Sequence, residues 1–263
     1  MVEEIRVGSW AELQEQLFAD AWQEEIGRFR SRFAFRGRND AAEDLRTSLI
    51  RLGGDVRAIE GPLLRSFRRY AQLEAVAADT AWNWLGLAQH HGLPTRLLDW
   101  TYSPLVALHF ATATTELFDR DGVVWMVDYG RAQAEAPEQL RRLLDENAMD
   151  VFSGELLAEV AAGLEELEEL ADDDFVLFLE PPSLNERIVN QYSLFSLLSR
   201  PDVRLDEWLD SRPEVARRVI VPAGLKWEAR DKLDQANVTE RVLFPGLDGL
   251  SRWLARYYSP RPR

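Results

Sequence analysis

The fold is decided by one stretch of sequence, Gln89-His-His-Gly-Leu-Pro-Thr-Arg-Leu-Leu-Asp-Trp-Thr101, which is followed one residue later by Ser103-Pro104. Gly92 and Pro94 end the helical pattern that precedes them. The residues from Thr95 to Thr101 then predict a strand. Ser103 is suited to an N-cap and Pro104 to a first helical position, so a helix should start at once. The stretch therefore predicts a strand that meets a helix with almost no loop.

Hydrophobic periodicity predicts further strands and helices on either side of this stretch. The expected helices are Trp10–Glu25, about Pro62–Leu87, Ser103 to about Leu117, about Lys226–Ala236 and about Leu247–Tyr257. The expected strands are Arg28–Gly37, Thr95–Thr101, Val123–Tyr129, Phe175–Leu179, Leu194–Leu198 and Arg217–Val221. Because the helical blocks are irregular and lack a βαβ rhythm, the pattern favours an α+β fold. We expect a small mixed or antiparallel sheet with helical N-terminal, middle and C-terminal segments.

Composition narrows the classes of protein and of site. The chain of 263 residues has a formal net charge of −14 and no cysteine. This excludes disulfides, thiolate nucleophiles and cysteine-bearing zinc sites. Met1–Trp10 carries Glu3, Glu4 and Arg6 in place of an apolar leader, and no apolar run is long enough to cross a membrane, so we expect a cytoplasmic protein with no membrane partner.

Charge is distributed unevenly along the chain. Glu155–Asp174 contains nine acidic and no basic residues, which predicts a solvated helix within an acidic helical insertion at about 131–173. Arg28–Arg38 contains five arginines and no acidic residue. On the predicted strand, Phe29, Phe33 and Phe35 alternate with the arginines. A local anion site is therefore expected despite the negative net charge.

Polar side chains in two of these segments are candidates for a common site. Arg36 presents a planar guanidinium that can hold a phosphate, and Gly37 would let a ligand approach the backbone. The alternative role of Arg36 is that of a structural arginine paired with an acid such as Asp99. Asp99 and Thr101 share one face of their strand, opposite Trp100, and the helix amides after Ser103 could receive a phosphate. Ser103 has the alternative role of a simple cap.

The three histidines do not have the spacing of metal ligands. His91, next to Gly92, could line a cleft and contact a ribose or base, or it could be a structural histidine. His109 is expected in the core or on a helix surface. His90 and His91 cannot share a helical face, and His109 belongs to the next helix. We therefore expect no metal.

The motifs resemble those of the FRG domain family. The resemblance is carried by Phe35-Arg-Gly37, the stretch from Gln89 to Thr101 with Ser103-Pro104, Ala107-Leu-His-Phe-Ala111, Arg187 with Gln191 and Phe195, and Leu243-Phe-Pro-Gly-Leu-Asp-Gly249. It covers nearly the whole chain and so implies one FRG-type domain over 1–263. The family is defined by motifs and not by an established activity, so the resemblance indicates relationship more than function.

A looser resemblance is to NAD-dependent ADP-ribosyltransferases. In those enzymes an aromatic-Arg-Gly strand and a later strand bearing Ser or Thr flank the dinucleotide. The resemblance implies a split sheet and NAD as substrate. It also implies nucleotide contacts from Arg36, Gly37, His91, Thr101, Ser103 and Arg187. The family pattern places a glutamate after a mobile loop. Here the loop is Pro181–Asn185, but the matching position is Gln191 and Glu186 lies five residues earlier. Either Gln191 holds the nucleotide without transfer, or Glu186 or Asp99 supplies the negative charge.

Two functions follow as hypotheses. The first is an ADP-ribosyltransferase-like NAD-binding enzyme with transferase or NAD glycohydrolase activity, or a degenerate relative of such an enzyme, in a bacterial defence or toxin system. Its acceptor would be a protein or a nucleic acid. Its catalytic residues would be Arg36, Asp99, Glu186 and Gln191. The second is a non-catalytic module that binds nucleic acid or a phosphorylated ligand through Arg30, Arg32 and Arg36. An enzyme should enclose Arg36 with Asp99, whereas a binding module should expose the three arginines broadly.

Overall fold

The computed structural model describes residues 1–71, 78–181 and 186–260. Strands and helices are both abundant and most strand pairs are antiparallel, so the α+β prediction is confirmed. The large sheet has the order β1-β9-β6-β4-β5-β8-β7, and β2 and β3 form a separate hairpin. The strands are β1 (Glu3–Arg6), β2 (Trp22–Gln23), β3 (Arg28–Phe29), β4 (Phe33–Arg38), β5 (Leu97–Thr101), β6 (Gly122–Asp128), β7 (Val176–Leu179), β8 (Ser193–Leu198) and β9 (Ala216–Val221).

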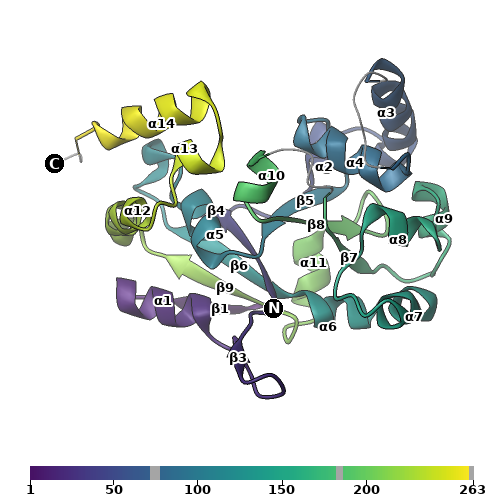
Figure 1. Cartoon of the computed structure of the whole chain (residues 1–263), viewed down its shortest axis with the longest axis horizontal. Helices are drawn as coiled ribbons and strands as arrows, with labels where there is room; N and C mark the ends of the chain where they lie inside the picture. Colours follow the sequence, from purple (N-terminus) through teal and green to yellow (C-terminus); the bar gives the residue numbers. More distant parts are fainter. Residues whose placement is uncertain (72–77, 182–185, 261–263) are drawn as a thin grey trace.

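Helices lie on both faces of the large sheet (Figure 1). The α-helices are α1 (Trp10–Phe18), α2 (Ser48–Leu52), α3 (Val56–Tyr70), α4 (Ala81–His90), α5 (Pro104–Ala111), α6 (Tyr129–Ala134), α7 (Glu138–Glu146), α8 (Gly154–Ala158), α9 (Leu164–Glu168), α10 (Glu186–Asn190), α11 (Leu205–Asp210), α12 (Lys226–Gln235), α13 (Glu240–Leu243) and α14 (Leu247–Tyr257). Two short 3₁₀ turns follow α5 and β9, at Thr115–Leu117 and Ala223–Leu225.

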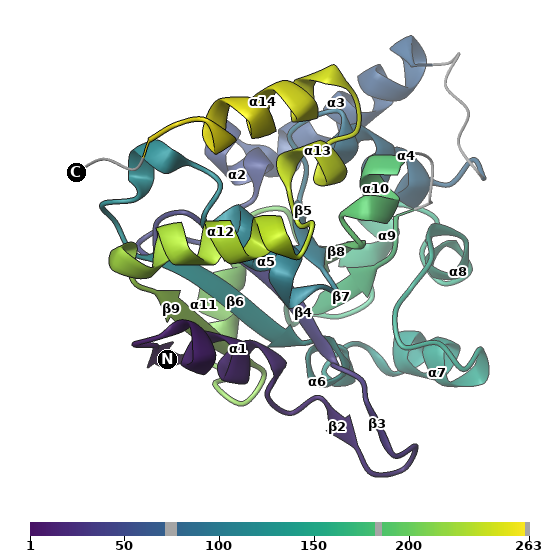
Figure 2. The ribbon, with the colours of Figure 1, turned by 60° about the vertical axis from the view of Figure 1, so that its left-hand side comes forward.

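The sheet is nearly split in two between β4 and β5. β4 pairs with β6 over six residues and β5 with β8 over five, whereas β4 and β5 are in register only at Phe35 and Thr101. On one face, α1, α5 and α12 pack against the half that contains β4, β6 and β9 (Figure 2). On the same face of the other half, Leu97, Leu177 and Leu197 pack with α4, α7 and α8. The two groups of helices therefore cover different halves of the sheet.

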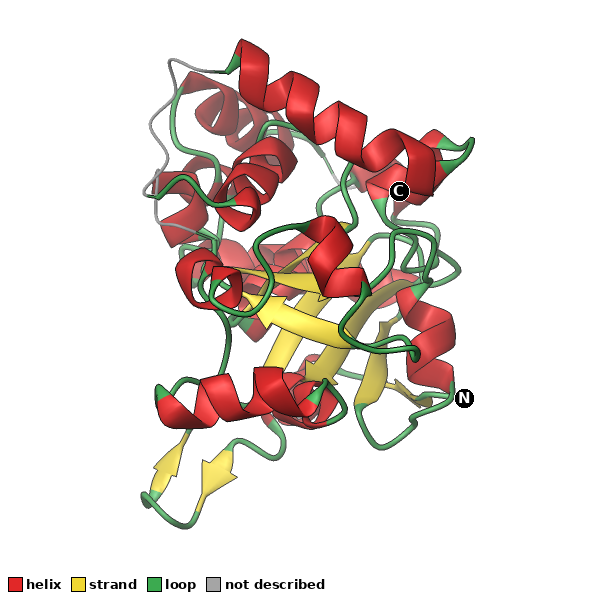
Figure 3. Ribbon diagram, turned by 90° about the vertical axis from the view of Figure 1, so that its right-hand side faces the viewer, coloured by secondary structure: helices red, strands yellow, loops and turns green. Residues whose placement is uncertain are grey.

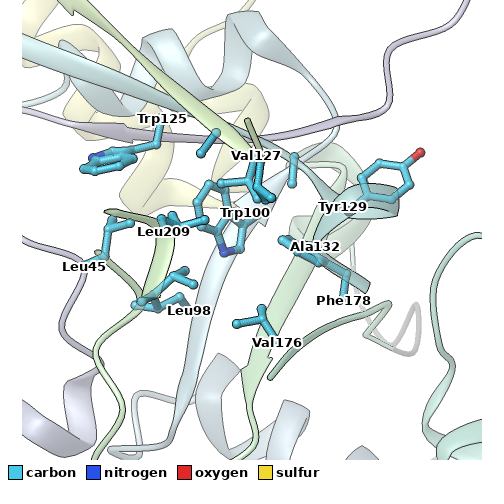
Figure 4. Close-up of a cluster of buried hydrophobic side chains, with 14 of the residues drawn as sticks. Leu45, Leu98, Trp100, Trp125, Val127, Tyr129, Ala132, Val176, Phe178 and Leu209 are labelled. Carbon is cyan, nitrogen blue, oxygen red and sulfur yellow. The ribbon is translucent and has the colours of Figure 1, made fainter. Parts of the chain in front are cut away.

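The opposite face of the sheet is closed by a continuous apolar cluster (Figure 4). Trp100 lies in this cluster, and its indole nitrogen donates to Ser196 Oγ at 2.9 Å. The prediction that Trp100 lies opposite Asp99 and Thr101 is confirmed, because it belongs to this core while Asp99 is exposed. His109 is completely buried in α5, where Nδ1 lies 2.9 Å from a nitrogen of Arg230. Burial and the charge of Arg230 lower the pKa of His109 to about 3.

Several predicted boundaries are wrong near the N-terminus. The first helix ends at Phe18 and not Glu25, because Asp20 has a positive φ and Trp22 begins the short β2. The single strand predicted over 28–37 is two strands: β3 pairs with β2, and β4 starts at Phe33. The β2–β3 hairpin projects from the body, so Phe29 is exposed and not part of an apolar strand face (Figure 3).

The predicted middle helices are also divided. The helix expected over 62–87 is α3 and α4; Pro62 lies inside α3, whose N-cap is Asp55, and positions 72–77 lie outside the described residues. The helix after Ser103 ends at Ala111 and not Leu117. Glu155–Asp174 is not one solvated helix: it holds α8 and α9, which bury Leu156, Leu157 and Leu167.

A buried charged cluster holds the start of β5. Arg96 donates through Nε to both carboxylate oxygens of Glu60, at 2.9 and 2.8 Å, and through Nη1 to the carbonyl of Ser199 at 2.7 Å. Its Nη2 also bonds to Glu168 at 2.6 Å. These contacts join α3, α9 and the end of β8 to the residue before β5.

Glu60→Gln should lower the free energy of unfolding by about 3 kcal/mol, because only the partly exposed Glu168 would then balance the charge of a guanidinium that is almost fully buried. The measurement is urea denaturation. Glu138→Gln is the control, since Glu138 forms an exposed pair with Arg142 that is worth about 0.5 kcal/mol or less. Equal losses in the two variants would contradict a structural role for the buried cluster.

Gly37 is required by the packing of α5 on β4. A Cβ there would lie 1.8 Å from the carbonyl oxygen of Ala107 and 2.6 Å from the nitrogen of Ala111, both backbone atoms. We therefore expect Gly37→Ala to destabilise the protein by about 3 kcal/mol, since backbone atoms must move to accommodate the methyl group. Gly224→Ala is the matched control, because nothing lies within 4 Å of a Cβ there. Thermal denaturation of both variants tests this expectation, and unchanged stability of Gly37→Ala would refute it.

Candidate functional site

A cavity of about 640 Å³ opens where β4 and β5 separate. The sheet, α4 with its C-terminal turn, α5 and α10 all contribute to its wall. Seven of the residues singled out from the sequence line it: Arg36, Gly37, His91, Asp99, Thr101, Arg187 and Gln191. Ser103 and Glu186 are not among its lining residues. The structure thus brings together polar groups that are up to 155 positions apart, from Arg36 to Gln191.

Arg36 is a largely buried cation in this wall. Its side chain is 14% exposed, and Nη1 donates to the backbone carbonyl of Asp99 and lies 3.8 Å from Asp99 Oδ2. Its Nε is buried and has no hydrogen-bond partner within the described parts of the chain. Burial lowers the pKa of Arg36, against the opposing effect of Asp99, and the charge of Arg51 lowers it further. The contacts with Asp99 fit a structural arginine, while the unsatisfied, desolvated donor fits an anion site.

Asp99 supplies the carboxylate of the cavity. Its side chain is 63% exposed, and Oδ2 accepts a hydrogen bond of 3.0 Å from Gln89 Nε2. Gln89 is oriented in turn by Thr95, whose hydroxyl donates to Gln89 Oε1 at 2.6 Å. Of the described residues that line the cavity, Asp99 is the only one with an acidic side chain.

Thr101 and Ser103 organise the junction between β5 and α5. The hydroxyl of Thr101 donates to the carbonyl of Gln191 at 2.7 Å and accepts from the backbone N–H of Ser103 at 3.0 Å. Ser103 Oγ accepts from the N–H of Val106 at 3.3 Å and so caps α5. The simple capping role is therefore the one that the structure gives Ser103.

Residues near α10 link the cavity to the C-terminal segment. Gln191 Nε2 donates to the carbonyl of Leu243 at 3.0 Å, and the Arg187 guanidinium lies over the ring of Phe244 at 5.1 Å. Burial, together with the charge of Arg187, lowers the pKa of His90, which also lines the cavity. His91 is the C-cap of α4, where its backbone N–H donates to Leu87.

Glu186 lies at the first residue of α10 and is exposed. Positions 182–185 of the loop expected at Pro181–Asn185 lie outside the described residues. The neighbouring Arg187, and not Glu186, contributes to the cavity wall.

The three arginines of the predicted basic face do not lie together. Arg36 lines the cavity beside Asp99, whereas Arg32 lines a different cavity with Asp128 and Arg131. Arg30 is exposed at the base of the β2–β3 hairpin. The break between β3 and β4 therefore separates residues that a continuous strand would have aligned.

Sequence reasoning missed several polar groups at the site. Arg38 has the same strand parity as Arg36 and lines the same cavity, so alternation alone could have found it. Gln89 is the first residue of the stretch that decides the fold, but no spacing rule connects it to Asp99. Arg46 and Arg51, which lie close to Arg36 and Arg38, come from another part of the chain, in and before α2.

Comparison with known proteins identifies part of the chain. Residues 31–120 match the family model of the FRG domain, which confirms the FRG resemblance for this part. The matched residues contain Arg36, Gln89 and Asp99, whereas Arg187 and Gln191 lie beyond them. Neither the curated proteins nor the solved structures gave a match.

The described residues contain neither a membrane-spanning helix nor a cluster of side chains suited to a metal ion. None of their helices combines the length and the apolar character needed to cross a membrane. Within the same residues, no group of three His, Cys, Asp or Glu side chains is arranged to hold a metal ion.

Proposed function

We propose that the cavity binds a nucleotide of the NAD class and that the protein is an ADP-ribosyltransferase-like enzyme, with transferase or NAD glycohydrolase activity. The observation that carries the proposal is the position of the Arg36 guanidinium beside the Asp99 carboxylate in the wall of one cavity of about 640 Å³. This volume lies within the range of small-molecule sites, about 300–1,000 Å³. The split between β4 and β5 supports the same proposal. A setting in a bacterial defence or toxin system is part of it and rests on the sequence resemblance.

In this proposal, arginine side chains hold the phosphates. Arg36 lines the cavity, and a guanidinium can bind phosphate through two parallel hydrogen bonds. Arg187 adds positive charge on the α10 side of the cavity. The helix amides after Ser103 are less suitable than expected, since Ser103 does not line the cavity.

The reaction would break the bond between the nicotinamide nitrogen and C1′ of the ribose. The electron pair leaves with nicotinamide, and positive charge develops on the ribose. A water or an acceptor group then bonds to C1′ and releases a proton. A carboxylate close to the ribose lowers the barrier by offsetting the developing charge. We assign this role to Asp99 and not to Glu186, because only Asp99 lines the cavity. Gln191, an amide, would orient the nucleotide.

Asp99→Asn should reduce NAD consumption about 10²-fold while NAD affinity stays nearly the same, because the amide keeps the shape and loses the charge. Glu186→Gln is the matched control and should leave turnover unchanged. The measurements are release of nicotinamide and calorimetric titration with NAD. Loss of turnover in Glu186→Gln alone would transfer the catalytic role to that residue. If the wild type binds NAD without consuming it, the protein is a degenerate relative that holds the nucleotide without transfer.

Arg36→Lys should weaken the binding of NAD and of ADP-ribose at least 10-fold, because an ammonium group lacks the planar fork of the guanidinium. Calorimetry with both nucleotides measures the effect. Arg68→Lys serves as control, since Arg68 pairs with Asp79 at the surface, away from the cavity. Wild-type affinity in Arg36→Lys would remove Arg36 from the binding site.

A further inference from the structure

A second, smaller cavity of about 280 Å³ adjoins the first. Arg36, Arg38, Gln89 and Asp99 line both cavities, so the two share one wall. The rest of the smaller cavity is formed by the segment around α2, which contributes Arg46, Ser48 and Arg51, and by Leu97 and Leu98. Arg36 and Asp99 therefore face both cavities, and a ligand in the larger cavity lies next to the smaller one.

The smaller cavity concentrates positive charge in a protein whose net charge is −14. Of the nine described residues that line it, four are arginines and one, Asp99, is acidic. Burial lowers the pKa of Arg38 to about 10, and the charges of Arg36 and Arg51 lower it further, against the opposing effects of Asp44 and Asp99. Mutual repulsion of this kind is relieved by a bound anion.

Two carboxylates outside the cavity hold these arginines without using all their donors. Asp44 accepts from Arg46 Nε at 2.6 Å and from Arg51 Nη2 at 2.7 Å, and Glu43 pairs with Arg38. Arg51 Nε also donates to the carbonyl of Arg46 at 3.3 Å. Since a guanidinium has five N–H groups, these bonds leave donors on both Arg46 and Arg51 for a ligand. Both side chains are nearly half exposed, at 45% and 42%, and hence accessible.

We infer that the smaller cavity is a subsite for an additional phosphate monoester on the bound nucleotide, so that the protein prefers a 2′-phosphorylated dinucleotide such as NADP to NAD. The inference rests on the proposed function, because Arg36 is taken to hold the diphosphate in the larger cavity. A phosphate monoester carries a charge of about −1.5 to −2 at pH 7, which suits a cluster of arginines. Dinucleotide-binding sites commonly use an arginine in this way for the 2′-phosphate.

The test is calorimetric titration of the full chain with NAD and with NADP. We expect wild-type protein to bind NADP at least 10-fold more tightly than NAD. Arg51→Gln should abolish most of this preference by weakening NADP binding much more than NAD binding. Arg46→Gln provides a second variant with the same expected effect, and the melting temperature of each reports whether it folds. Arg57→Gln is the matched control, because Arg57 pairs with Asp202 at the surface and lines neither cavity.

The outcomes separate the inference from the proposed function. Equal affinities of wild-type protein for NAD and NADP overturn the phosphate subsite and leave the proposed function standing. The same holds if NADP is preferred but folded Arg46→Gln and Arg51→Gln both keep that preference. Binding of neither dinucleotide overturns both proposals. Binding of a short RNA in place of either dinucleotide also overturns both and favours the nucleic-acid alternative.

Discussion

The structure depends on the point where β4 and β5 stop pairing. β4 and β5 are in register at Phe35 and Thr101, and they separate on the side of this pair where Arg36 and Asp99 lie. There the Arg36 side chain donates to the carbonyl of Asp99. A strand carbonyl that lacks a neighbouring strand still needs a hydrogen-bond partner, so a side chain that takes the place of the missing strand pairing stabilises the gap. The same guanidinium then lies in the cavity that the gap creates. A structural role and a binding role for Arg36 are therefore compatible.

The side chains that anchor β5 and α5 beside this gap are charged and deeply buried. Arg96 anchors the start of β5 to α3 and α9, and Arg230 joins α12 to His109 in α5. Buried ion pairs add little net stability, but removal of one partner leaves an uncompensated charge. The geometry of β5 and α5 is thus fixed by groups that tolerate few alternative arrangements. This is the condition for holding Arg36, Gln89 and Asp99 in one orientation.

The sequence predicts local features well and tertiary neighbours poorly. Strand parity places Asp99 and Thr101 on one face, and the Ser103 cap marks the start of α5, because both depend on a few adjacent residues. The first helix ends before the predicted Glu25, because Asp20 has a positive φ and Trp22 pairs with Phe29 in a hairpin. Helical periodicity cannot reveal this hairpin partner. Arg51 approaches Arg38 only through the folding of α2 onto the sheet. Glu186 is close to Gln191 in sequence, yet the start of α10 keeps it out of the cavity wall.

The sheet order also sets a constraint on how the chain acquires its structure. β1 lies at one edge of the sheet and pairs in parallel only with β9, which is more than 200 residues later. At synthesis rates of about 5–20 residues per second, β1 leaves the ribosome roughly 10–40 seconds before its partner strand exists. Its exposed N–H and C=O groups could pair with other chains during that time. The glutamates in Glu3–Arg6 carry charges that disfavour such pairing, so the segment is protected against aggregation before it can fold.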